Sequence, residues 1–122
     1  MSEVTRTERG WAGHFIGARD CTFRRNTLLE CGDKRVVVST VGSYIPPGTC
    51  NKPSEIGYHR YYETMAFPAR WIDPYWEADT TVSEIPFKSQ RVIDHCECGT
   101  DSEANMMHEA VVTEFITEME EA

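Results

Sequence analysis

Histidine, arginine and glutamate side chains occur in this chain where they could together bind an anion and move a proton. His59 and Glu63 are four residues apart in a run whose alternation fits a strand, so both side chains fall on one face. Arg25 lies in the middle of another β-prone run, and His14 lies in an aromatic segment near the N-terminus. Such a set could hold a phosphate group and transfer a proton. The sequence therefore leaves open a small enzyme or binder acting on a nucleotide or phosphorylated metabolite, with His14, Arg25, His59 and Glu63 as its catalytic residues.

The alternative for the same residues is structural. Arg25 and Glu63 can form a buried ion pair, while His14 and His59 can be ordinary core or edge histidines. No nucleophile motif or phosphate-binding glycine loop accompanies them. The balance therefore favours a protein that is not an enzyme, and the sequence predicts no cofactor.

A second group of residues could ligate zinc: His95, Cys96 and Cys98 in one short segment, with His108 further along. Zinc sites usually have two to four residues between paired cysteines and a second ligand pair at a set distance. One residue separates Cys96 from Cys98, and no second pair lies at that distance. The spacing favours loop thiols and a helix-flank histidine, and a zinc-bound interaction module remains a third alternative.

Charge is concentrated at the C-terminal end of the chain. Residues 1–99 contain 13 acidic and 12 basic side chains, whereas residues 100–122 contain seven acidic and no basic ones, so most of the net charge of −8 lies there. Apolar residues in this segment recur at helical spacing and predict a buried stripe: Ala104, Met107, Val111, Phe115 and Met119. The remaining surface would be acidic, with the partner-binding candidates Glu109, Glu114, Glu118, Glu120 and Glu121.

An acidic helix of this kind has two interpretations. It can dock onto a host protein with a basic surface, or it can be a solvated face that keeps the chain soluble. A second copy of the chain is one candidate partner, as a homo-oligomer. We expect no direct binding of nucleic acid, because phosphate contacts need Lys and Arg. The longest apolar runs fall well short of the ~20 residues that a membrane span requires, so no membrane partner is expected.

Length and composition favour a single domain over residues 1–122, since 122 residues with 40% hydrophobic content suit one globular core. Within it we expect a frayed N-terminus at 1–9, a β-rich body at 10–99 and an acidic amphipathic helix at 100–122. The N-terminus has no apolar segment typical of a secretory signal. Five cysteines without such a signal indicate reduced thiols in the cytoplasm.

The clearest local element is a hairpin formed by residues 21–31 and 34–44 around Gly32-Asp33. Counting outward from the turn pairs Leu29 with Val36 and Leu28 with Val37, and it places Glu30 opposite Arg35 as a favourable cross-strand charge pair. Both faces are apolar near the turn, so both must be covered. The helix can cover one face, and more of the sheet, folded over, or a second chain can cover the other.

The remaining pattern completes the predicted architecture. Strands are expected at 11–18, at 58–67 with Pro68 as its end, and more weakly at 76–87 and 91–93, with a bend at 70–75 and loops at 46–57 and 94–101. The fold class is therefore α+β, with a curved antiparallel sheet of about five strands and one long acidic C-terminal helix.

Four segments carry a resemblance to known proteins: Thr7 to His14, Phe23 to Leu29, Val38 to Gly42 and Arg60 to Phe67. In these the chain resembles a group of small proteins of bacteriophages, prophages and mobile elements that has no assigned activity. The resemblance covers most of residues 7–80 and implies a phage or prophage context in a bacterial host cell. In that setting small acidic proteins often inhibit host defence systems, which makes a host protein the expected partner.

Overall fold

A computed structural model describes residues 3–9, 21–45, 48, 60–79, 90–94 and 101–121, without the side chains of residues 43, 60, 61 and 90–94. These residues form a sheet of six strands and one helix. Their bounds are β1 Thr5–Glu8, β2 Cys21–Cys31, β3 Lys34–Tyr44, β4 Arg60–Ile72, β5 Tyr75–Ala78, β6 Gln90–Asp94 and α1 Asp101–Glu121.

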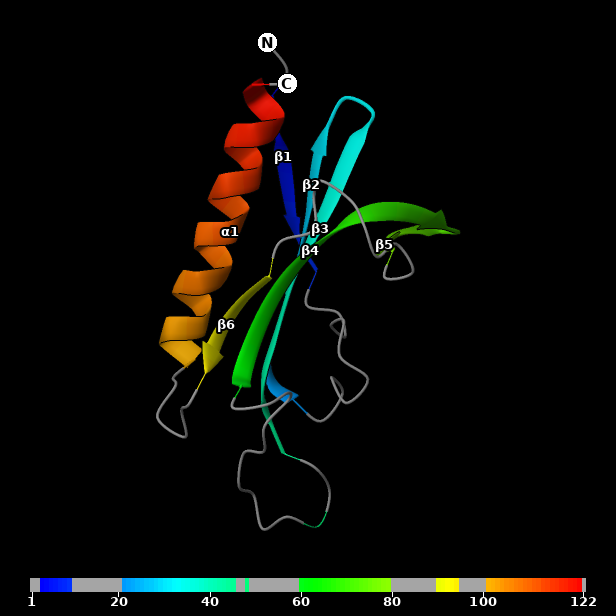
Figure 1. The fold of residues 1–122 in the computed structure, drawn as a ribbon. Helices are drawn as coiled ribbons and strands as arrows, with labels where there is room; N and C mark the ends of the chain where they lie inside the picture. The colour runs from blue at the N-terminus through cyan, green and yellow to red at the C-terminus, as the bar shows by residue number, and fades with distance from the viewer. Residues whose placement is uncertain are drawn as a thin grey trace.

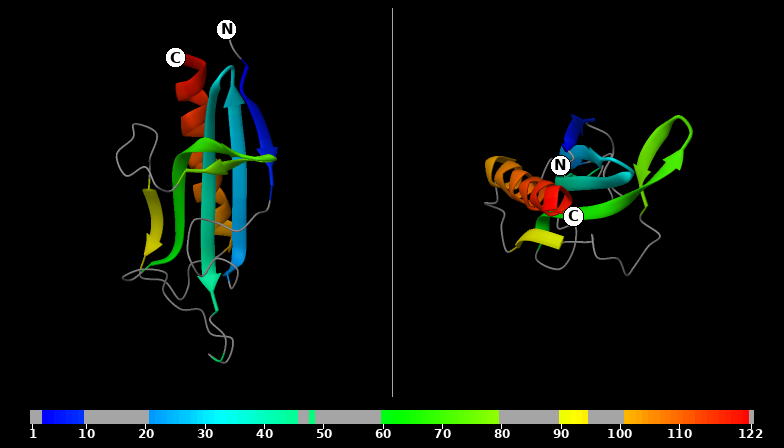
Figure 2. Two further views of the ribbon diagram at one scale, coloured as in Figure 1. Left: turned by 90° about the vertical axis from the view of Figure 1, so that its right-hand side faces the viewer. Right: turned by 90° about the horizontal axis from the view of Figure 1, so that it is seen from above.

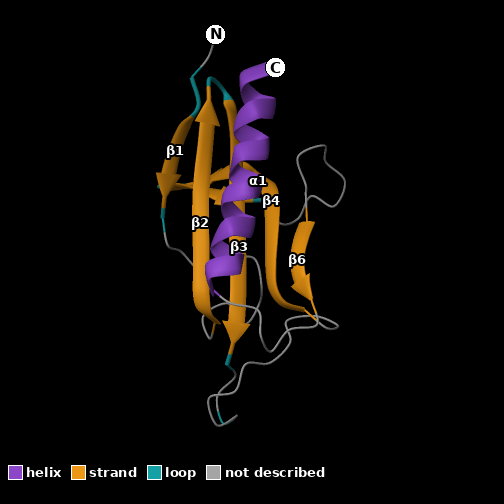
Figure 3. Cartoon of the chain, turned by 90° about the vertical axis from the view of Figure 1, so that its left-hand side faces the viewer, coloured by secondary structure: helices purple, strands orange, loops and turns teal. Residues whose placement is uncertain are grey.

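The sheet is antiparallel in the order β1-β2-β3-β4-β5, and β6 pairs with β4. The helix α1 runs along one face of this curled sheet, across β2, β3 and β4 (Figures 1 and 3). The prediction of an α+β fold with a curved antiparallel sheet and one C-terminal helix is confirmed.

The β2–β3 hairpin has the predicted register. Leu29 lies opposite Val36, Leu28 lies opposite Val37, and Glu30 lies opposite Arg35. The Arg35 Nε donates a 3.0 Å hydrogen bond to the Glu30 carboxylate, so the predicted charge pair is formed. Gly32 in the turn has φ +63°, a conformation that glycine adopts without steric cost.

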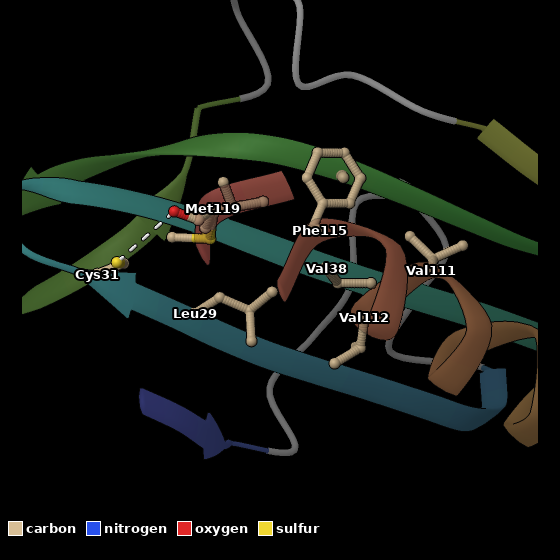
Figure 4. Packing of buried hydrophobic residues seen from close by; sticks show 9 residues of the cluster. Leu29, Cys31, Val38, Val111, Val112, Phe115 and Met119 are labelled. Atoms are coloured by element: carbon tan, nitrogen blue, oxygen red, sulfur yellow. Dashed lines mark hydrogen bonds between the residues drawn. The ribbon is translucent and has the colours of Figure 1, made fainter. Parts of the chain in front are cut away.

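The apolar core lies between α1 and the sheet. Figure 4 shows Val111, Val112, Phe115 and Met119 from the helix packed against sheet residues that include Leu29, Cys31 and Val38. Four of the five stripe positions predicted from helical spacing are buried, and Met107 is half-buried. His108, which the sequence predicts as a helix-flank histidine, is instead fully buried.

Two local predictions are wrong. Thr5–Glu8 form the edge strand β1 against β2, where the sequence predicts a frayed terminus. Pro68 does not end its strand, because it occupies the last β3–β4 pair, opposite Val36, and its carbonyl accepts a 2.8 Å hydrogen bond from the Asp79 amide. β4 therefore continues to Ile72, and the bend predicted at 70–75 is limited to a turn at Asp73-Pro74 that leads into β5.

The second face of the sheet is also buried, as both-sided apolar strands require. Val37 and Phe67 on this face are almost fully inaccessible. The β4–β5 hairpin swings to the side of the sheet away from α1 (Figure 2), where the Arg35 guanidinium lies 4.3 Å above the Trp76 ring. Of the two covers considered for this face, more of the sheet or a second chain, the structure shows the first beside Arg35. The predicted strand at 11–18, most of the predicted loop at 46–57 and the segments 80–89 and 95–100 lie outside the described residues.

Candidate functional site

A buried polar network lies beneath the first half of α1. His108 is fully buried, with Nε2 2.7 Å from the Thr27 hydroxyl and Nδ1 2.6 Å from the Thr40 hydroxyl. The Thr40 hydroxyl lies 2.5 Å from that of Thr64, and the Thr27 hydroxyl also hydrogen-bonds Glu8. We call Thr27, Thr40, Thr64 and His108 the threonine–histidine network. One helix and three adjacent strands contribute to it, because register places Thr40 between the helix-facing positions of β2 and β4.

The network has a single direction of hydrogen-bond donation, which follows from the chemistry of its members. The Glu8 carboxylate can only accept, so the Thr27 hydroxyl donates to it and accepts from Nε2–H of His108. Nδ1 of the neutral ring then accepts from Thr40, which in turn accepts from Thr64. The donors and acceptors thus assign His108 as the neutral Nε2–H tautomer.

A charged cluster lies beside this network at the edge of the sheet. We call Arg6, Glu8, Arg25 and Glu109 the charged quartet. Arg6 forms a bidentate pair with Glu109 at 3.0 and 2.9 Å, and Arg25 contacts the same carboxylate at 2.8 Å. Arg25 also pairs with Glu8 and donates a 2.8 Å hydrogen bond to Asn105 Oδ1. Two cations and two anions neutralise one another and attach α1 to β1 and β2.

The pKa values of this region reflect those contacts. Hydrogen bonds from Arg6 and Arg25 lower the pKa of Glu109 to about 2, although desolvation opposes the shift. Burial lowers the pKa of His108 to about 3, and the positive charge of Arg25 adds to that shift. His108 is therefore neutral and Glu109 is ionised at neutral pH.

The catalytic set predicted from sequence is not assembled among the described residues. Arg25 and Thr64 both lie opposite Thr40, so they share the helix-facing side of the sheet. Glu63, next to Thr64 along β4, faces the opposite side, where alternation places it away from Arg25. His14 and His59 lie outside the described residues. Arg25 pairs with Glu8 and Glu109 instead of Glu63.

The zinc candidates are similarly separated. His95, Cys96 and Cys98 lie outside the described residues, and both ring nitrogens of His108 are already engaged by threonine hydroxyls. In the part of the chain that the structure describes, no group of three or more His, Cys, Asp or Glu residues is placed to hold a metal ion.

The partner-binding candidates on α1 fall into two groups. Glu114, Glu118, Glu120 and Glu121 are exposed on the second half of the helix. Glu109 is only half-exposed and is occupied by two arginines. A different exposed surface, rich in large apolar side chains, lies at the β4–β5 hairpin, where Trp71, Ile72 and Tyr75 are each about half exposed.

Sequence reasoning missed the residues that join the two polar clusters. The sequence predicts Glu8 in a frayed terminus, although alternation of threonine with charged residues at 5–8 is compatible with an exposed strand. Thr27 and Thr40 were placed on the correct face by the predicted register, but nothing local to β2 or β3 indicates that a helix residue 81 or 68 positions away lies between them.

Comparison with known proteins adds no family assignment to this geometry. In the described residues, no helix is long and apolar enough to cross a membrane. Searches against protein-family models, curated proteins and solved structures found no match to this chain.

Proposed function

We propose that this chain is a binding protein that docks the exposed acidic surface of α1 onto a basic surface of another protein. The observation that supports it is the exposed negative charge on the second half of the helix. There Glu118, Glu120 and Glu121 are exposed, and residues 100–122 contain no lysine or arginine that could neutralise them.

The position of these carboxylates is fixed by the core. Phe115 and Met119 are buried on the same two turns, so the backbone that carries the glutamates is held against the sheet. The carboxylates at Glu118, Glu120 and Glu121 also lie at the negative end of the helix dipole, where they are unfavourable without a cation. A basic partner would relieve that cost, and electrostatic complementarity would speed association and favour basic over acidic partners.

Glu109 is excluded from the proposed interface. Its carboxylate is bound by Arg6 and Arg25 and is part of the attachment of α1 to the sheet. Replacing Glu109 by lysine would place a third cation beside Arg6 and Arg25 and disturb the fold. Loss of binding in that variant would therefore not identify an interface. Removing α1 would likewise expose the core, so truncation at residue 99 is not a usable test.

The resemblance to bacteriophage and prophage proteins directs the proposal to a bacterial host protein, and inhibition of a host defence system is the fitting consequence. A nucleotide-directed enzyme has less support. Its proposed anion-binding residue, Arg25, is held by two carboxylates and by Asn105. A ligand phosphate would have to displace both carboxylates to reach the guanidinium.

Affinity capture from bacterial lysate with two matched charge reversals tests the proposal. Glu118→Lys and Asp73→Lys each change the net charge from −8 to −6, one on α1 and one at the exposed turn of the β4–β5 hairpin. A partner captured in stoichiometric amount by the wild type and by Asp73→Lys should bind Glu118→Lys at least about tenfold more weakly. If both variants lose binding equally, the effect comes from net charge. If both bind the partner as tightly as the wild type does, docking through α1 is contradicted.

A further inference from the structure

The contacts of α1 with the sheet divide at residue 110. Residues 101–109 are attached through polar side chains, and Ala104 and His108 are their only fully buried members. The turns that follow are attached through apolar packing of Val111, Val112 and Phe115. The two halves of one helix are therefore held by different forces.

The polar side chains that hold residues 101–109 come from four strands, β1, β2, β3 and β4. Tyr62 donates a 2.8 Å hydrogen bond to Asp101 at the start of the helix, and Arg25 binds Asn105 and Glu109. Further attachments are the Arg6–Glu109 pair from β1 and the hydrogen bonds of His108 with Thr27 and Thr40.

Among the described side chains, the carboxylate that favours a positively charged His108 ring is Glu109, and it is already bound by Arg6 and Arg25. The charged side chains are Arg6 and Glu8 on β1, Arg25 on β2, and Asp101, Glu103 and Glu109 on the helix itself. The facing positions of β3 and β4 carry the uncharged Thr40 and Thr64 and, at the helix start, Tyr62. On β6, Arg91 occupies the register position opposite Thr64.

We propose that residues 101–109 of α1 form an acid-released latch, in which protonation of His108 frees this half of the helix from the sheet while the Val111–Met119 half stays packed. In the closed latch Nδ1 accepts a hydrogen bond from Thr40. A protonated ring must donate there instead, so Thr40 has to turn its own proton away from the ring, and if that proton goes to Thr64 the Thr40–Thr64 hydrogen bond reverses as well. The new charge would also lie near Arg25, whose carboxylate partners are already occupied.

The sign of the pH effect follows from the difference between the closed and open states. Burial lowers the pKa of His108 from its ordinary value of 6.5 to about 3, so the open latch binds a proton that the closed latch rejects. Between pH 6.5 and 4.5 the opening equilibrium should rise by about fiftyfold, about fivefold over the first pH unit and nearly tenfold over the second. Glu109, with its pKa lowered from 4.5 to about 2, adds its own effect only below pH 4.5.

Native-state hydrogen exchange between pH 7 and 3.5, corrected for intrinsic exchange rates, measures this opening for each half of α1 in the full chain. The expected result is a rise of about fiftyfold in the opening of residues 105–109 between pH 6.5 and 4.5, with a much smaller rise at residues 111–119. Equal rises in both halves would overturn the latch, because the helix would then leave the sheet as one unit.

Two variants separate the titrating groups. His108→Gln keeps a polar side chain but cannot titrate, so it should lose the rise between pH 6.5 and 4.5. Glu109→Gln should keep that rise and lose the effect below pH 4.5. If His108→Gln does not fold, the ¹⁵N shifts of the His108 ring in the wild type show at which pH the ring is protonated. If the ring titrates near pH 6.5 while residues 101–109 stay attached to the sheet, the proposal is overturned.

Discussion

The Thr40 hydroxyl donates a 2.6 Å hydrogen bond to Nδ1 of His108 across 68 residues of sequence. Thr40 also accepts from Thr64, so it connects β3 and β4 to the centre of α1. All three side chains are fully buried. Because an unpaired buried polar group costs more than a hydrogen bond gains, this connection is a sensitive point of the fold.

The position of Thr40 predicts unequal effects for two isosteric substitutions. Thr40→Val leaves both Nδ1 of His108 and the Thr64 hydroxyl without a partner, so it should lower the free energy of unfolding by about 1–3 kcal/mol. Thr64→Val removes only the terminal donor and should cost roughly 1 kcal/mol. Urea denaturation measures both, with the exposed Thr113→Val as the control. A larger loss for Thr64→Val than for Thr40→Val would contradict the assigned direction of donation.

The charged quartet predicts a pH-dependent contribution of Glu109. Its pKa is about 2 in the folded chain against an ordinary 4.5, so its stabilising effect is complete above pH 4.5 and is lost as the pH falls toward 2. Glu109→Gln should therefore be less stable than the wild type at pH 7, by about 1 kcal/mol or less because the side chain is 42% exposed. That difference should shrink below pH 4.5.

Denaturation curves at several pH values check this prediction, with Glu120→Gln as a control for losing one charge from α1. A stability difference between Glu109→Gln and the wild type that stays constant from pH 7 to 2.5 would show that the ion pairs contribute nothing through ionisation.

Gly42 gives a prediction based on close packing. A Cβ at this position would overlap the ring of Tyr62, which packs edge-on against Phe23 with centroids 6.0 Å apart and anchors Asp101. Gly42→Ala should destabilise the chain by about 1–3 kcal/mol through overpacking. In a Tyr62→Ala background the additional cost should largely disappear, because the two residues are coupled. Additive losses in the double variant would refute the packing explanation.

The apolar half of the helix interface predicts the largest effect of a single truncation. Phe115 is 2% exposed in the core cluster, so Phe115→Ala should cost about 3–5 kcal/mol. Met106, on the same helix, is 70% exposed, and Met106→Ala should change stability by less than about 0.5 kcal/mol. Thermal or urea unfolding gives the comparison, and similar losses in the two variants would place the core elsewhere.

The elements determined by nearby residues were the predictable ones. The β2–β3 register follows from Gly32-Asp33 and the Glu30–Arg35 pair, since a two-residue turn fixes every pair outward from it. The helix follows from the spacing of Ala104, Val111, Phe115 and Met119, and its predicted range of 100–122 agrees with the observed Asp101–Glu121 to within one residue at each end.

The residues that require distant partners were not predictable. Glu8 obtains its role from Arg25 and Thr27, and His108 obtains its role from three strands that pair far along the chain. The sequence predicts a strand end at Pro68 because proline normally interrupts a ladder, whereas here Pro68 lies at the last β3–β4 pair, where its lack of an N–H is tolerated. Periodicity ranks His108 as a flank residue because it carries no information on which polar groups lie beneath the helix.

Carboxyl-group footprinting of the complex with the captured partner tests the central claim most directly. Labelling of Glu118, Glu120 and Glu121 should fall severalfold in the complex, while Asp73 at the β4–β5 turn should label as it does in the free chain. Unchanged labelling of the three α1 glutamates, or protection confined to Asp73 beside the exposed Trp71 and Tyr75, would place the interface on the hairpin and contradict docking through the acidic helix.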